Sequence, residues 1–307
     1  MSNVPAVDPP TNCTLQTCPV ATSFYSYRIN LAANLAFLIL FSLLTLSYLA
    51  IWLLIRRGHT YATVMILGTI SEIIGYAGRV WSYYDQWNET PYLIQIICLT
   101  IAPAFYSAGV YLCLAGIVRV FGEGNSRVRP LWYTYIFVPC DVIALVLQAA
   151  GGALAATSID GASDAAELNT GVDILLAGLS WQVFTLTCFI VLCGDLAWRI
   201  RRRCRAMGAD VALSQDPESV GIRKPKRFQY FLGALALATI LILWRCAYRV
   251  AELNDGFSGP ITYKQGLFIG FEGVLIIVAA TLMVVAHPIV CLRGNVIGNS
   301  EKTTDKA

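Results

Sequence analysis

The chain has 307 residues, of which 57% are hydrophobic and 13% are charged, and its formal net charge is +3. An ordinary soluble domain carries about 25% charged residues, so this composition excludes a water-soluble domain built around one apolar core. The sequence contains no Gly-x-x-x-x-Gly-Lys-Ser/Thr phosphate loop, which argues against a transport ATPase.

The N-terminal tail, residues 1–30, is polar and lacks the basic start and apolar run of a signal peptide, so we expect it to be retained. Cys13 and Cys18 lie in this tail, and in an oxidising compartment we expect them to form a disulfide. Asn12 begins one N-glycosylation sequon and Asn88 begins another, although Pro91 makes Asn88 the poorer acceptor.

Long apolar segments fill most of the remaining chain. A transmembrane helix needs about 20 mostly apolar residues, and such segments recur between short polar interruptions. The predicted spans are Leu31–Ile55, Tyr61–Trp81, Tyr92–Val120, Leu131–Ala156, Val172–Trp198, Phe228–Glu252 and Thr262–Val290. We therefore predict an all-α integral membrane protein with seven transmembrane helices in one domain, residues 31–290, followed by a cytosolic tail, residues 291–307.

The loops between these spans alternate in charge. Lys and Arg gather in one set, above all in residues 199–227, while residues 82–91 and 157–171 contain neither. The positive-inside rule assigns the basic loops to the cytosol, which places the N-terminus outside and the C-terminus inside. An Arg cluster beside a span is typical of a topology signal and of contact with anionic membrane lipids, so we predict no nucleic-acid partner.

Several predicted spans contain ionisable or amide side chains. An ionisable group inside a span costs at least about 2.5–3.5 kcal/mol on insertion scales, and such groups are candidates for function. Glu72 and Arg79 are seven residues apart and share one helix face, while Arg245, Arg249 and Glu252 follow an i, i+4, i+7 spacing. The candidate ligand-binding residues are Glu72, Arg79, Asp141, Gln148, Gln182, Arg245, Arg249, Glu252 and Glu272.

These groups have two interpretations. The expected helix directions place Arg79, Gln148 and the polar residues of the sixth span in the outer half of the membrane, with the others nearer its middle, and this arrangement predicts a polar pocket that opens outward. Alternatively, the groups pair with one another, for example Glu72 with Arg245 or Glu272 with Arg249, and hold the bundle together.

Other seven-helix classes fit poorly. The sequence has only two histidines, and no cysteines have metal-ligand spacing, so we predict no metal site, no catalytic site and no enzyme activity. Lys264 lies at the mouth of the last span, too shallow for a retinal Schiff base. The third span ends in Gly116-Ile117-Val118-Arg119 rather than in the Asp-Arg-Tyr of G-protein-coupled receptors.

The charged segments resemble the fungal RTA1-like family, also called the lipid-translocating exporter family. The resemblance rests on Glu72–Arg79, Ala102–Tyr111, Pro139-Cys140-Asp141 through Gly152, Gly178–Gln182, Arg245–Glu252, Glu272 and His287-Pro288, with Ile289 where members often have glycine. It implies a multi-pass protein of the fungal plasma membrane or vacuolar membrane. It also implies export of sphingoid long-chain bases, resistance to toxic or sterol-like amphiphiles, or handling of porphyrin and haem.

Three functions follow as hypotheses. The first is a transporter or translocase of an amphipathic lipid-like molecule, in which the arginines hold an anionic head group and the acids hold an amine or carry protons. The second is a membrane sensor of the same amphiphile. The third is a porphyrin-binding transporter, with haem as a ligand, and no other cofactor is expected.

Overall fold

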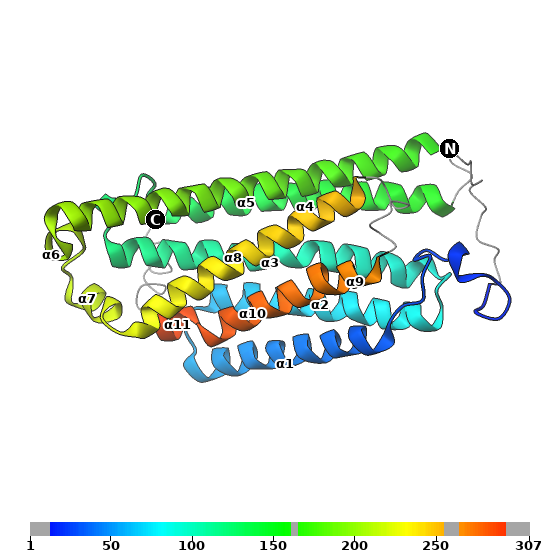
Figure 1. Cartoon of the computed structure of the whole chain (residues 1–307), viewed down its shortest axis with the longest axis horizontal. Helices are drawn as coiled ribbons and strands as arrows, with labels where there is room; N and C mark the ends of the chain where they lie inside the picture. The colour runs from blue at the N-terminus through cyan, green and yellow to red at the C-terminus, as the bar shows by residue number, and fades with distance from the viewer. Residues whose placement is uncertain (1–12, 161–164, 255–263, 293–307) are drawn as a thin grey trace.

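The computed structural model describes residues 13–160, 165–254 and 264–292, and its regular secondary structure is helical throughout these ranges (Figure 1). Seven helical segments are long and apolar enough to cross a membrane, which confirms the predicted number of spans. Six of them are α1 (Leu31–Ile55), α2 (His59–Tyr84), α3 (Glu89–Phe121), α4 (Pro130–Asp160), α5 (Ala165–Met207) and α8 (Lys226–Leu253).

The seventh span is interrupted. It consists of α9 (Gln265–Leu267), the π-helical segment η3 (Phe268–Val274), α10 (Leu275–Val285) and α11 (Pro288–Cys291). The sequence predicted a continuous span from Thr262 to Val290, because apolar length carries no information about π-helical hydrogen bonding. The shorter helices are η1 (Val20–Thr22), η2 (Glu123–Asn125), α6 (Ala209–Ala212) and α7 (Pro217–Arg223).

The helix ends differ from the predicted span ends most in the fifth span. It was predicted to run from Val172 to Trp198, whereas α5 begins at Ala165 and continues through the arginine-rich segment to Met207. Arg, Ala and Met are strong helix formers, so the helix continues beyond the apolar residues. Hydrophobicity therefore predicts which part of a helix can lie in lipid, but it does not predict at which residue the helix ends.

The bundle packs around α3, whose most apolar stretch is the most buried of the seven, while that of α1 is the least buried and α1 lies along one edge (Figure 1). α4 and α5 run side by side along the opposite edge. Glycines permit their close approach: a Cβ atom added to Gly151 would lie 2.7 Å from the carbonyl oxygen of Gly171. Larger residues at these positions would force the two helices apart.

The polarity of the bundle is that of a membrane protein. Large apolar side chains such as Leu54, Tyr135 and Val191 are exposed on its outside, while charged side chains from α2, α8 and η3 are buried within it. With no hydrophobic force between helices in lipid, close packing and internal hydrogen bonds must hold such a bundle together.

Candidate functional site

All nine predicted ligand-binding residues are buried, with at most 5% of any of them exposed. The structure brings them together in two groups. The first lies among α2, α3, α8 and η3 and contains Glu72, Arg79, Arg245, Arg249, Glu252 and Glu272. The second lies between α4 and α5 and contains Asp141, Gln148 and Gln182.

Two ion pairs organise the first group. Arg245 Nη2 lies 2.5 Å from Glu272 Oε1, and the same nitrogen donates to the backbone carbonyl of Leu99 on α3. Arg249 Nη1 lies 2.6 Å from Glu252 Oε2, one turn further along α8. These pairs differ from the predicted examples, Glu72 with Arg245 and Glu272 with Arg249. Spacing along a helix identifies its polar face, but the partner across the bundle depends on how each helix is rotated.

No carboxylate among the described residues pairs with Arg79. Its Nε donates to Asn34 Oδ1 at 2.9 Å, and its Nη2 donates to the Tyr27 hydroxyl at 3.0 Å. The guanidinium also lies over the Phe268 ring, 3.9 Å from the ring centre. Neutral acceptors and a ring face therefore solvate this cation.

Glu72 is the unsatisfied member of the group. It is fully buried, and neither of its carboxylate oxygens makes a hydrogen bond within the described part of the chain. The hydroxyl groups of Tyr76 and Tyr106, both within electrostatic range of Glu72, also have no hydrogen-bond partner there. Buried polar groups in proteins are normally hydrogen-bonded, so this set calls for a functional explanation.

Glu272 lies inside the π-helical segment η3. Such segments are rare and are frequently found at functional sites, because the altered backbone points a side chain where a regular helix would not. Here Glu272 points at Arg245 of α8. The interrupted seventh span thus supplies the acid that faces α8.

The second group makes its own contacts. Asp141 accepts hydrogen bonds from Ser107 on α3 and, at 3.4 Å, from Thr185 on α5. Gln148 donates to Gln182 at 3.0 Å. Contrary to expectation, these side chains link α3, α4 and α5 and do not line the outer cavity of the first group.

That outer cavity has a volume of about 40 Å³. The first group contributes Arg79, Arg249 and Glu252 to its wall, and the N-terminal segment contributes Tyr25 and Tyr27. Such a volume holds about three water molecules. The cavity is small and has both charged and aromatic residues in its wall, and the N-terminal segment was not foreseen as part of it. The ligand-binding pocket stays a prediction.

The N-terminal segment, residues 20–30, packs against the C-terminal end of α2 and the N-terminal end of α3. Tyr25 is buried, and its hydroxyl hydrogen-bonds to Gln95 at 2.5 Å and to Ser82 at 3.1 Å. Its ring packs against Tyr92. Burial raises the pKa of the Tyr25 hydroxyl to about 12, so the group is a neutral donor near pH 7. The segment thereby covers the cavity.

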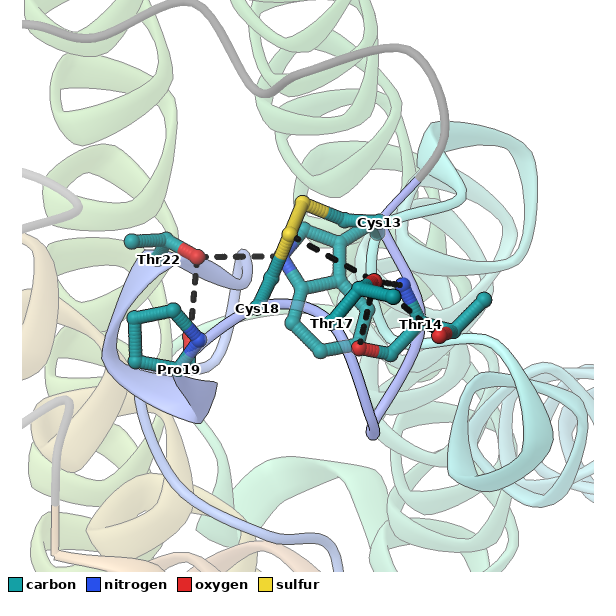
Figure 2. The surroundings of a disulfide bond; sticks show 7 residues. Cys13, Thr14, Thr17, Cys18, Pro19 and Thr22 are labelled. Atoms are coloured by element: carbon teal, nitrogen blue, oxygen red, sulfur yellow. Dashed lines mark hydrogen bonds between the residues drawn. A yellow bond between two sulfur atoms is a disulfide. The ribbon is translucent and has the colours of Figure 1, made fainter.

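A disulfide between Cys13 and Cys18 closes a small loop just before this segment (Figure 2). Trp87, in the connection between α2 and α3, donates to the Thr22 hydroxyl at 3.2 Å. Asn88 accepts from the backbone N–H of Thr90 and so caps the start of α3, whereas Asn12 lies outside the described residues. At the other end of the bundle, His287 caps α11.

Sequence comparison identifies the family. Residues 65–295 match the family described as RTA1 like protein. The chain belongs to the RTA1-like family. The matched region contains the charged members of both buried groups, and it begins after the N-terminal segment that covers the cavity.

Several yeast proteins are similar to this RTA1-like chain. The sphingoid long-chain base transporter RSB1 of Saccharomyces cerevisiae is 29% identical over 91% of this chain and 77% of its own length. Protein RTM1 of Saccharomyces cerevisiae is 29% identical over 76% of this chain and 69% of its own length. Protoporphyrin uptake protein 1 of the same species is 29% identical over 75% and 68%, respectively. No solved structure matches the chain.

Proposed function

We propose that this RTA1-like protein is a transporter of amphipathic molecules that carry an amine, of the sphingoid long-chain base type. The observation that supports this most is the buried group of charged residues in a bundle that otherwise faces lipid. Burying six charged side chains is not explained by stability alone, because buried ion pairs contribute little to the stability of a fold. The similarity to a sphingoid base transporter gives the class of ligand.

The outer cavity is the proposed entry site. Glu252 lines it and would pair with the ammonium group of the ligand, while Arg79 and Arg249 would hold hydroxyl or anionic groups of the head. The alkyl chain would lie among lipid-facing apolar side chains. Because the cavity has room for only a few waters, we infer a closed state in which the N-terminal segment must move aside before a ligand enters.

We propose that the protein lies in the plasma membrane with its N-terminus outside. The basic residues of the α5 end and of α7 would then be cytosolic and contact anionic lipids. The disulfide and the sequons at Asn12 and Asn88 would lie in the oxidising, glycosylating compartment. The vacuolar membrane is the alternative location.

Flux through liposomes tests the proposal. Purified protein in sealed vesicles should accelerate the transfer of a fluorescent sphingoid base without ATP, and Glu252→Gln should slow that transfer. Asp195→Asn, at a partly exposed surface pair, should leave the flux unchanged. Saturable binding without any acceleration of transfer would instead support a sensor.

Porphyrin transport is the second candidate, because protoporphyrin uptake protein 1 is similar over most of the chain. The arginines at the cavity would face the propionates of a porphyrin. Titration with haem or protoporphyrin should then shift the Soret band, and Arg79→Gln should remove the shift. Saturable sphingoid base flux with no porphyrin binding would reject this candidate.

A further inference from the structure

The charges around Glu72 do not balance if all of them are ionised. Arg245 is already paired with Glu272 at 2.5 Å. An ionised Glu72 beside this pair would add an unpaired negative charge in a site with no exposed surface. Burying an isolated carboxylate is so unfavourable that such a group takes up a proton instead.

The surroundings of Glu72 offer no other way to stabilise a negative charge. Tyr76 of α2 and Tyr106 and Cys98 of α3 are neutral, and Glu272 of η3 is an acid whose charge repels a second one. Arg245 of α8 is the one cation within range among the described residues, and Glu272 holds it. On the α1 side, the rings of Phe37 and Phe41 pack beside Tyr76.

We propose that the ammonium group of the ligand, after entering at Glu252, moves on to Glu72 and there exchanges with a proton. This rests on the proposed function. In the closed state Glu72 carries a proton, and Glu72, Glu272 and Arg245 together are neutral. When the ligand arrives, the carboxyl O–H bond breaks, the proton leaves to water, and the carboxylate binds the ammonium. The site is again neutral. The Glu72 carboxylate can therefore hold either the proton or the ammonium group, but not both at once.

A single exclusive site has a consequence for transport. If Glu72 must be occupied by one cation or the other while the protein changes conformation, each ligand moving one way is matched by a proton moving the other way. A pH difference across the membrane then drives the amphiphile, and no nucleotide is needed. Glu272 lies in the π-helical segment η3, which makes the seventh span the element that we expect to rearrange.

Binding measurements at several pH values test the exchange. The probe is a sphingoid base in detergent, with its N-acylated, uncharged analogue as the control ligand. While Glu72 of the free protein is protonated and the amine is charged, the affinity of the wild type for the base should rise about tenfold for each unit of pH, because one proton is released for each amine bound. The dependence should level off above the pKa of Glu72, and the amine stays charged below its usual pKa of about 10. Glu72→Gln should lose this dependence and Glu72→Asp should keep it. A wild-type affinity independent of pH, or an unchanged dependence in Glu72→Gln, would overturn the proposal.

Infrared spectroscopy supplies a readout that needs no ligand. The wild type should show the carboxylic acid band of a buried protonated side chain, and Glu72→Gln should lack it. Glu272→Gln should also lose it, because Arg245 would then have no other carboxylate and Glu72 would ionise to pair with it. Asp195→Asn, at a partly exposed surface pair, should keep the band. A band that persists in Glu72→Gln would show that another group holds the proton and would refute the assignment. Failure to bind sphingoid base would refute the proposed function, and the band would still decide whether Glu72 carries a proton.

Discussion

Replacing Glu252 by glutamine distinguishes a binding site from a purely structural ion-pair network, when compared with the same change at Glu272 in a Glu72→Gln background, where Glu72 cannot ionise and pair with Arg245 instead. Both changes leave a buried arginine without its carboxylate, but the two arginines have different surroundings. Arg249 borders a cavity that can hold water and also lies 3.4 Å from the Thr100 hydroxyl, whereas Arg245 does not line that cavity. Water and a hydroxyl can solvate the first charge but not the second.

The expected magnitudes follow from this difference. Relative to Glu72→Gln, the double variant Glu72→Gln/Glu272→Gln should lower the free energy of unfolding by about 3–5 kcal/mol, the usual cost of stranding a charge in an enclosed pair. Glu252→Gln should lower it by about 1.5–3 kcal/mol, the value of a hydrogen bond to a charged group. Glu252→Gln would also remove a charged hydrogen bond to the ammonium group of the ligand, and a loss of the same size there would weaken the binding of a sphingoid base about tenfold or more.

The assay pairs unfolding in detergent with ligand affinity for both variants. Asp195→Asn is the control, because its pair with Arg199 is partly exposed and should contribute about 0–1 kcal/mol. If Glu252→Gln is as destabilising as the change at Glu272 in the Glu72→Gln background and leaves the affinity unchanged, the charged residues are a structural network and the binding interpretation is refuted.

Three further predictions concern the cover, the helix contact and the topology. Tyr25→Phe removes the hydrogen bonds to Gln95 and Ser82, so association of the ligand should become up to about tenfold faster, and an unchanged rate would show that this segment does not limit entry. Gly151→Ala should destabilise by about 1–3 kcal/mol because its Cβ would meet the α5 backbone, whereas Gly233→Ala, with open space around it, should be neutral or stabilising. Protease should cleave residues 199–227 only after sealed cells are permeabilised, and cleavage from outside would reverse the topology.

The helical bundle was predictable from the sequence because lipid imposes a strong and simple requirement. Each span must supply about 20 apolar residues, and a charge inside one is costly enough to be noticed. That reasoning located every member of the two buried groups.

The contacts across the bundle were less predictable. Spacing placed Arg245 and Arg249 on one face of α8, but the choice of Glu272 and Glu252 as partners depends on helix rotation and on the π-helical turn in the seventh span. The covering segment was missed for a different reason. Tyr25 and Tyr27 lie in a polar tail without periodicity, and their partners Gln95 and Arg79 are 70 and 52 residues away along the chain.

The length of α5 has a mechanical consequence. Its 43 residues span about 65 Å at 1.5 Å per residue, roughly twice the thickness of the hydrocarbon layer. One end of this helix packs against α4 near Gly151, and the other reaches towards α6 and α7, where Arg203 donates to the carbonyl of Gly124. A few degrees of tilt at the contact with α4 would move the far end of α5 by several ångströms, so a small change at one end of the bundle would be enlarged at the other.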